Sequence, residues 1–213
     1  MILPLERRRA LTAKSQAYAG NADQAMPYLA SRGLTKEVAA MFSLGYVSEG
    51  EYAGRVSIPY VTPGGVVAIK YRCADISHGE HKDKDLKCPK YLSESGVGIH
   101  LFNAQVLIRC ADTIVVTEGE MDAICVQAYT GLPAVAYPGV DTFHKQRYFR
   151  LCFEGVGEVI VVADGDEPGR MAAHKVAESI GMNARVVDLP NGEDSSSFIA
   201  SQGAGRFLER VAS

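Results

Sequence analysis

The second half of the chain alternates between short apolar runs and longer amphipathic segments. The apolar runs have no polar face, as strands buried on both sides of a parallel sheet do, and they cover 113–117, 133–137, 158–163 and 184–188. The amphipathic segments between them predict helices at 121–129, 142–150 and 168–180, and one or two short helices follow between Ser195 and Val211. This alternation predicts an α/β fold, with a parallel sheet flanked by helices on both faces.

The first half has a different pattern. A basic, alanine-rich segment from Met1 to about Gly20 predicts a helix, and two short helices are expected within 26–33 and 36–42, capped by Asn21 or Asp23 and by Thr35. Two strands, 55–60 and 66–72, flank a Thr-Pro-Gly-Gly turn and predict an antiparallel hairpin. The polar stretch from Asp75 to Lys87 lacks periodicity and predicts a mobile loop. We therefore expect a smaller α+β subdomain at 1–110, followed by the α/β domain at 111–213.

Composition and charge narrow the class of protein only a little. The 213 residues are 47% hydrophobic and 22% charged, which is typical of globular proteins. No apolar run approaches the roughly 20 residues of a membrane helix, and no signal peptide is evident, so we expect a cytoplasmic protein without a membrane partner. The first 110 residues carry a net charge of +4 (14 basic, 10 acidic) and the remainder −7 (8 basic, 15 acidic). Ordinary surface solvation also accounts for an imbalance of this size.

The five cysteines are scattered and form no C-x-x-C pair, which argues against a zinc ribbon or finger. Cys110, Cys125 and Cys152 lie in apolar contexts that predict core thiols. Cys73 and Cys88 flank the polar loop, and we expect no metal role for them. No zinc is therefore expected in this chain.

Acidic residues follow two of the predicted strands. Glu118 comes directly after 113–117, and Asp164 and Asp166 come after 158–163. Strands of a parallel sheet deliver such groups into one crevice, and clustered carboxylates repel one another unless a cation is present. The alternative is that Asp164 and Asp166 only cap the next helix, which would explain one acid but not two with a matching glutamate. We favour a divalent metal site, and for Asp194 capping and metal binding are equally plausible.

These acids belong to longer motifs. Glu118-Gly119-x-x-Asp122, Asp164-x-Asp166-x-x-Gly169 and Leu189-Pro190-x-Gly192-x-Asp194 resemble the three acidic signatures of Toprim domains. Several upstream motifs occur in the order found in DnaG-type primases: Tyr28-Leu29-x-x-Arg32-Gly33-Leu34, Phe42-x-Leu44-Gly45-Tyr46, Arg55-Val56-x-Ile58-Pro59, Pro89-Lys90-Tyr91-Leu92 and Leu101-Phe102-Asn103. The chain thus resembles a DnaG-type primase catalytic core with a Toprim domain, from about Met26 to Asp194.

The resemblance implies metal-dependent synthesis of short RNA primers from NTPs on a single-stranded DNA template. It assigns catalysis and binding of Mg²⁺ or Mn²⁺ to Glu118, Asp164 and Asp166, with Asp122 and Asp194 in support. It assigns contacts with template, RNA primer or triphosphate to Arg55, Arg72 and Lys90, and Lys70 on the same predicted strand joins them. From the residues alone, the better explanation is that Lys70 and Arg72 are solvent-facing residues of a strand and that Lys90 is a surface stem packed on an aromatic ring.

The sequence also departs from the family pattern. We expect neither the zinc-binding module with which such primases begin nor their terminal helicase-interacting domain. A family lysine between Lys90 and Leu101 has no counterpart. The resemblance is therefore to a reduced, phage-type core that works with a replicative helicase and a separate zinc-binding primase subunit. Two alternatives stay open: a Toprim nuclease in which Glu118 activates water, and a non-catalytic module that binds single strands and recruits a helicase.

Overall fold

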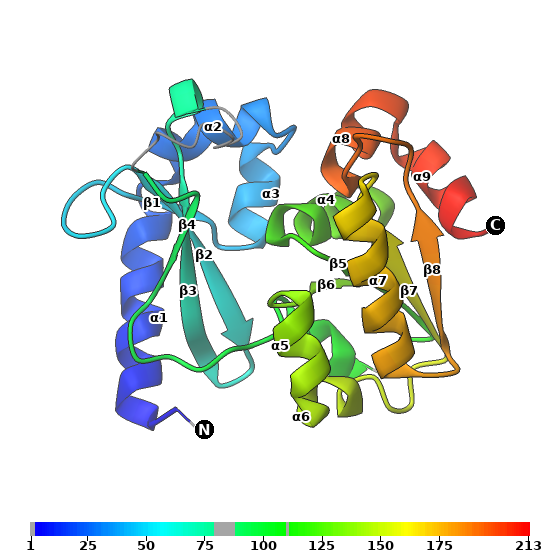
Figure 1. Ribbon diagram of the computed structural model, residues 1–213. Helices are drawn as coiled ribbons and strands as arrows, with labels where there is room; N and C mark the ends of the chain where they lie inside the picture. The colour runs from blue at the N-terminus through cyan, green and yellow to red at the C-terminus, as the bar shows by residue number, and fades with distance from the viewer. Residues whose placement is uncertain (1–2, 79–87, 110) are drawn as a thin grey trace. The chain divides into compact units, whose positions relative to one another are not determined.

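The structure is a computed structural model that describes residues 3–78, 88–109 and 111–213 (Figure 1). The chain forms two compact units, Met1–Ile99 and His100–Ser213. The residues from 100 to 109, which the sequence analysis grouped with the first domain, therefore pack with the second unit. Residues 79–87 of the predicted polar loop, and Cys110, lie outside the described residues.

The first unit is built on an antiparallel sheet of four strands in sequence order: β1 (Gly45–Val47), β2 (Arg55–Thr62), β3 (Gly65–Cys73) and β4 (Tyr91–Ser93). The predicted hairpin is β2–β3, in which Thr62 pairs with Gly65. Gly65 closes this turn at φ 101°, a backbone conformation that glycine adopts without steric cost. The register of β3 with β4 sets Arg72 opposite Tyr91.

A long helix and a group of short helices pack against this sheet. The long helix α1 (Leu5–Ala19) packs against β3, and its Leu11 joins Tyr52 and Tyr71 in the core of the unit. The remaining helices are η1 (Ala22–Ala25), α2 (Met26–Ser31), α3 (Lys36–Met41) and η2 (Ile76–His78). Thr35 caps α3 as predicted, by accepting a hydrogen bond from the Val38 N–H. The expected capping by Asn21 or Asp23 was wrong, because the Asn21 side chain makes no capping bond and Asp23 lies inside η1.

The second unit contains the predicted parallel sheet. Its strands lie in the order β6 (Ala134–Ala136), β5 (Thr113–Thr117), β7 (Glu158–Ala163) and β8 (Ala184–Asp188). Three of these strands have the bounds that the apolar runs predict. Helix α4 (Glu120–Thr130) connects β5 to β6 in one direction, and α7 (Glu167–Ile180) connects β7 to β8 in the other. Because such crossovers are right-handed, the two helices cover opposite faces, and the strand order reverses between β5 and β7.

The remaining helices complete these two layers. Helices α8 (Ser195–Gln202) and α9 (Ala204–Val211) pack with α4, whereas α5 (Val140–Lys145) and α6 (Arg147–Leu151) pack with α7. We predicted one helix over 142–150, but Gln146 has an extended backbone that divides it. Phe143 and Phe149, six residues apart, would leave a continuous helix on different faces. The break allows both rings to stack in the core, with their centroids 5.7 Å apart.

Two further observations bear on the expectations above. Cys125 is buried as predicted, but Cys152 is exposed, because its neighbour Phe153 takes the core position. Within the described parts of the chain, no helix is long and apolar enough to cross a membrane.

Candidate metal centre

The candidate metal centre belongs to the second unit and lies where the parallel sheet reverses its strand order. β5 and β7 are neighbouring parallel strands, with Val116 paired to Val161, so Glu118 and Asp164 leave the same edge of the sheet. Open α/β sheets bind ligands in the crevice at such a point, beyond the carboxyl ends of the strands. The topology thus brings together the acids of two motifs that are more than forty residues apart in the sequence.

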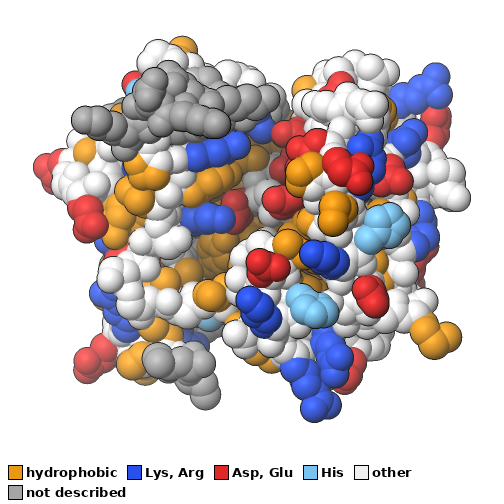
Figure 2. Space-filling model, in the orientation of Figure 1, with side chains coloured by type: hydrophobic (Ala, Val, Ile, Leu, Met, Phe, Trp, Pro, Cys, Tyr) orange, Lys and Arg blue, Asp and Glu red, His pale blue; other side chains and the backbone are white. Residues whose placement is uncertain are grey.

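Four of the five predicted acids act electrostatically on the carboxyl group of the fifth, Asp164. Burial, followed by the negative charges of Asp122, Glu118, Asp194 and Asp166, raises the pKa of Asp164 to about 8. A carboxylate is destabilised both by loss of water and by like charges, so both causes favour its protonated form. The five acids therefore form one acidic cluster around Asp164, which we call the acidic cluster. Figure 2 shows Asp and Glu side chains gathered where α7 begins.

Helix starts orient three members of this cluster. Asp166 is the N-cap of α7 and its Oδ1 accepts the Gly169 N–H at 2.7 Å. Asp194 is the N-cap of α8, and its Oδ1 accepts the Ser197 N–H at 2.7 Å within a capping box. Asp122, in the first turn of α4, accepts the Ser196 N–H at 2.9 Å. Asp166 and Asp194 therefore do cap helices. Capping holds their carboxylates in place and is compatible with membership of the acidic cluster.

Three glycines permit this crowding, because a Cβ atom at any of them would collide with the cluster or its supports. At Gly119 the Cβ would lie 2.4 Å from Asp122 Oδ2, and at Gly169 it would lie 2.9 Å from Asp164 Cβ. At Gly165 it would lie 1.8 Å from the carbonyl oxygen of Pro190. Gly165 also donates to Glu193 O at 2.7 Å and accepts from the Gly192 N–H at 2.8 Å, which joins the loops after β7 and β8.

Sequence reasoning missed two residues of this site. Tyr137 follows β6 at the same sheet edge, and its buried hydroxyl donates a hydrogen bond to Glu118. Burial and the charges of Glu118 and Asp164 raise the pKa of Tyr137 far above its usual value, so the phenol keeps its proton. Ser196 donates its N–H to Asp122 and its hydroxyl to Asp194 Oδ1, at 2.8 Å. Position after a strand was the available signal for Tyr137, and position two residues after the N-cap Asp194 was the signal for Ser196.

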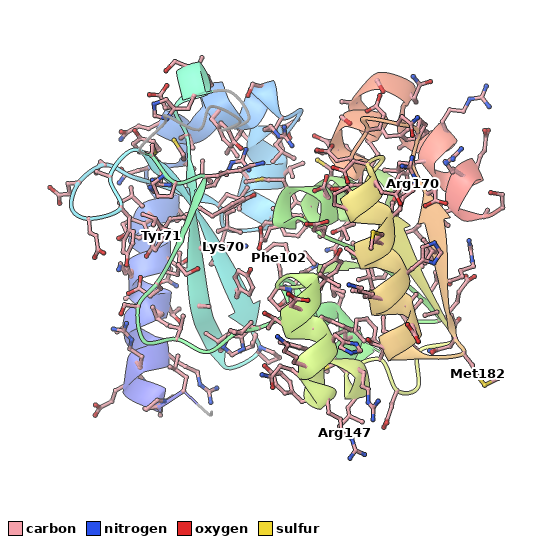
Figure 3. The ribbon with its side chains drawn as sticks, in the orientation of Figure 1. Lys70, Tyr71, Phe102, Arg147, Arg170 and Met182 are labelled. Atoms are coloured by element: carbon pink, nitrogen blue, oxygen red, sulfur yellow. The ribbon has the colours of Figure 1, made fainter. Side chains whose placement is uncertain are left out.

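The predicted basic residues lie in the first unit, where an aromatic ring brings two of them together. Lys70 Nζ and Arg72 Cζ lie 4.6 Å and 4.8 Å from the centroid of the Tyr91 ring. Both side chains leave the same face of β3, from which Lys70 extends in Figure 3. Arg72 also lies 5.6 Å from the Tyr28 ring and is buried, whereas Lys70 is half-buried. We call Lys70, Arg72 and Tyr91 the basic–aromatic cluster.

The other two predicted basic residues have different surroundings. Arg55 is buried, and its guanidinium donates to Pro89 O at 2.8 Å and to Cys88 Sγ at 3.2 Å. Lys90 is half-buried, and its carbonyl oxygen accepts the Cys73 N–H. Arg55 therefore fixes the segment that carries Lys90. Phe102 is in the core, at 2% exposure, whereas Tyr91 is half-buried.

The residues of the acidic cluster fit a hard divalent cation. Mg²⁺ and Mn²⁺ prefer carboxylate oxygens, and the cluster offers such groups from β5, β7, α4 and α8. Without a positive charge, the five acids of the cluster repel one another, as the raised pKa of Asp164 records. The donor set thus matches the cation class that the sequence predicts.

Known proteins resemble the chain in sequence and in fold. A Toprim-like family profile matches residues 115–199. The gene 57 protein of Mycobacterium phage D29 is 38% identical over 165 residues, which are 75% of this chain and 99% of that protein. The DNA primase of Pseudomonas putida is 29% identical, over 88% of this chain and 34% of the primase. A solved structure, of a DnaG primase catalytic domain bound to ssDNA, matches 98% of this chain and 77% of its own at 24% identity and a TM-score of 0.77.

The phage protein, the bacterial primase and the solved structure each match parts of both units, whereas the Toprim-like profile lies within the second unit. The chain spans almost the whole phage relative but only about a third of the bacterial primase. The Toprim-like match begins in β5 and ends in α8, and so contains all five acids of the acidic cluster. The fold match confirms the predicted parallel sheet flanked by helices. The chain therefore belongs to the DnaG-type primase family and carries a Toprim domain.

Proposed function

We propose that this chain is the catalytic core of a DNA primase, which joins NTPs into short RNA primers on single-stranded DNA in a reaction that requires a divalent metal. The observation that carries this proposal is the convergence of four acids on Asp164, at the point where the parallel sheet reverses its strand order. The chain covers about a third of the length of the bacterial relative. That this part is sufficient for primer synthesis is therefore itself part of the proposal.

In this proposal Glu118, Asp164 and Asp166 hold Mg²⁺ or Mn²⁺, and Asp122 and Asp194 support them. The bound cations supply the positive charge that offsets the triphosphate and the leaving pyrophosphate. The chain's own residues fix the site: the Tyr137 hydroxyl orients Glu118, and the Ser196 N–H orients Asp122. Preorganised carboxylates do not have to reorient during the reaction, which favours catalysis by positioning.

The basic–aromatic cluster is the proposed contact for template, primer or triphosphate. Lysine and arginine contact phosphates, and an aromatic ring offers a surface on which a base stacks. Lys90 belongs to the same contact, and Arg55 supports it from within the unit by holding Pro89. A similar solved domain was determined with ssDNA bound, which supports this assignment. A replicative helicase and a separate zinc-binding primase subunit are the proposed protein partners.

A single assay tests the proposal. Purified protein is incubated with single-stranded template, labelled NTPs and Mg²⁺ or Mn²⁺, as wild type and as Glu118→Gln and Asp164→Asn. We expect short RNA products from the wild type, and less than about a hundredth of that yield from either variant, since even supporting residues of metal sites cost 10–100-fold. Asp141→Asn is the matched control, because it removes an exposed acid of the same unit outside the acidic cluster.

The same assay separates the competing functions. Template degradation that depends on Glu118 and Asp164 would replace the primase proposal with a nuclease that uses the same acids. Template binding with neither synthesis nor degradation, also after addition of a zinc-binding primase subunit, would leave a non-catalytic binding module.

A further inference from the structure

A second group of metal-binding side chains lies in the first unit. Cys73 is the last residue of β3, His78 ends η2, and Cys88 comes shortly before β4. Their ligand atoms all lie within 4.8 Å of one another. The antiparallel pairing of β3 with β4 produces this meeting, because the Cys73 N–H donates to Lys90 O and Arg72 pairs with Tyr91. Cysteines fifteen positions apart thereby become neighbours.

The distances within this group are those of ligands around one tetrahedral ion. Bonds of about 2.3 Å to sulfur and 2.05 Å to nitrogen place two sulfurs about 3.8 Å apart, and a sulfur and a nitrogen about 3.5 Å apart. Cys73 Sγ lies 3.6 Å from Cys88 Sγ and 3.4 Å from His78 Nδ1. A disulfide bond would require about 2.05 Å between the sulfurs. The side chains thus stand at ligand spacing and not at bonding distance.

A second layer of contacts orients the histidine. His78 presents Nδ1 to the cysteine sulfur, and its Nε2 lies 3.4 Å from the Asp75 carboxylate. Metal-bound histidines commonly donate the other ring N–H to a carboxylate, which fixes the ring and its tautomer. Asp75 is itself held, since its Oδ1 accepts the N–H of Ser77 at 2.9 Å and the Ser77 hydroxyl at 2.6 Å.

The cysteine side of the group has a cation beside it. Arg55 donates to Cys88 Sγ at 3.2 Å, so its guanidinium holds this sulfur in place beside Cys73. Two thiolates and a neutral imidazole are soft to borderline donors. They suit Zn²⁺ much better than Mg²⁺, which prefers oxygen.

We propose that Cys73, His78 and Cys88 bind one Zn²⁺-class ion, with water in the fourth position and Asp75 as the carboxylate partner of His78. Binding releases the two thiol protons to solvent. The ion would cross-link the end of β3 to the segment before β4 and so fix the chain next to Arg55 and Lys90. This site differs from the acidic cluster in unit, donor atoms and preferred metal. The absence of C-x-x-C spacing predicted no zinc in this chain, but these ligands are brought together by strand pairing instead.

Metal retention and cobalt absorption test this site. Reduced full-length protein is loaded with ZnCl₂ or CoCl₂ in the presence of excess MgCl₂, which competes at the acidic cluster, and is then dialysed. We expect the wild type to retain one zinc per chain, and Cys73→Ser and Cys88→Ser to retain none above the buffer level. The Co²⁺ form of the wild type should show thiolate-to-cobalt charge-transfer absorption, which the acidic cluster cannot produce.

Two substitutions extend the test to variants that preserve both sulfurs. His78→Ala should abolish zinc retention, and Asp75→Asn should weaken zinc affinity by about 10–100-fold, as expected for a partner of a metal-bound histidine. Cys152→Ser is the matched control, because Cys152 is exposed in the second unit, and it should retain zinc like the wild type.

Three results would overturn the proposal. The first is zinc retention by the wild type no higher than by the cysteine variants. The second is a cobalt form without thiolate absorption, a result that does not depend on whether any variant folds. The third is a Cys73–Cys88 disulfide that resists the reductant used in the assay and leaves no thiolate to bind the ion.

Discussion

Asp164 connects the chemistry of the acidic cluster to the stability of the fold. Its pKa of about 8 lies far above the ordinary value of 3.8, because it is half-buried and lies among four other acids. Between these two values the folded chain holds a proton that the unfolded chain has lost. The stability that this group contributes is therefore present below about pH 4 and is lost as pH rises through about 8.

Removal of divalent metal should reveal this dependence. In the presence of EDTA, we expect the wild type to lose stability relative to Asp164→Asn as pH rises from about 4 to about 8. Added Mg²⁺ or Mn²⁺ competes with the proton, so its stabilising effect should grow over the same interval. Urea unfolding at several pH values, with and without metal, measures both effects. Parallel pH profiles for the two proteins would contradict the assigned pKa.

Glu94, a buried acid of the first unit, has a pKa shifted in the opposite direction. Burial alone would raise its pKa, but hydrogen bonds from Lys14 and Tyr71 and the charge of Arg7 outweigh burial and lower it. These contacts tie α1 to β3 and to the residue after β4, with Lys14 Nζ 2.8 Å from the carboxylate. A lowered pKa adds stability above the ordinary pKa of an acid, and this stability is lost as pH falls.

Glu94→Gln should therefore destabilise the chain at neutral pH by about 1–3 kcal/mol, the cost of losing hydrogen bonds to a buried charged group. The difference from the wild type should shrink as pH falls below about 4.5. Glu49→Gln, at an exposed glutamate of the same unit, should have little effect. Equal stability of wild type and Glu94→Gln at neutral pH would show that Glu94 contributes no net stability.

At this scale the sequence identified charged residues better than their partners. The five acids could be found because each follows a strand or starts a helix. Tyr137 has no formal charge at neutral pH, and only the strand order places it beside Glu118. Arg55 has the charge expected of a phosphate contact. Its burial and its hydrogen bonds to Cys88 and Pro89 depend on the contact between β2 and the segment that precedes β4, which the sequence does not reveal.

At the scale of elements, the runs that were apolar throughout were predicted best. β5, β7 and β8 have the expected bounds because they are short apolar runs with clear polar limits. The helix predicted at 142–150 was divided because the buried positions of Phe143 and Phe149 overrode its local periodicity. The antiparallel pairing of β3 with β4 is not encoded in any local sequence pattern. The cysteine–histidine group depends on this pairing and could therefore not be predicted.

The loop between β7 and α7 offers a test of how tightly these elements must fit. Gly165→Ala would place a Cβ 1.8 Å from the Pro190 carbonyl oxygen, so the backbone has to move. Overpacking of this kind costs about 1–3 kcal/mol, and here the shift also displaces Asp164 and Asp166. We expect reduced stability in urea and weaker stabilisation by Mg²⁺ or Mn²⁺.

Gly205→Ala provides the matched control for this prediction. A Cβ at Gly205 would meet nothing within 4 Å, and the residue lies in α9. Alanine is favoured over glycine in a helix by up to about 1 kcal/mol, so this variant should be at least as stable as the wild type. If Gly165→Ala matched Gly205→Ala in stability and metal response, the close approach to Pro190 would not constrain the site.

At the scale of the whole molecule, chemistry is divided between the two units. The acidic cluster lies in His100–Ser213, and the basic–aromatic cluster lies in Met1–Ile99. The charge difference between the halves indicated this division, although surface solvation explained it equally well. The placement of residues 100–109 in the second unit was not predictable from charge. Phe102 pairs through its backbone with Ala136 of β6, a contact that only the folded sheet provides.

This division predicts that binding of single-stranded DNA and catalysis can be separated by substitution. Each phosphate contact that is lost should reduce the slope of log K against log salt concentration by about 0.7 for a single strand. Lys70→Ala should therefore weaken binding and flatten its salt dependence by about that amount. Lys175→Ala, at an exposed lysine of the second unit, should leave the slope unchanged. Fluorescence anisotropy of a labelled oligonucleotide across a salt series gives these slopes.

Glu118→Gln should have the opposite effects on DNA binding and on catalysis. It removes negative charge, so binding of single-stranded DNA in EDTA should be as strong as in the wild type or stronger, while primer synthesis is lost. Lys70→Ala should retain the response of stability to Mg²⁺ or Mn²⁺ that Glu118→Gln loses. If Glu118→Gln lost DNA binding in EDTA, or if Lys70→Ala lost the metal response, the two clusters would not act as separate binding and catalytic sites. Reciprocal behaviour would assign one role to each unit, because each substitution would then affect only the measurement that its own cluster controls.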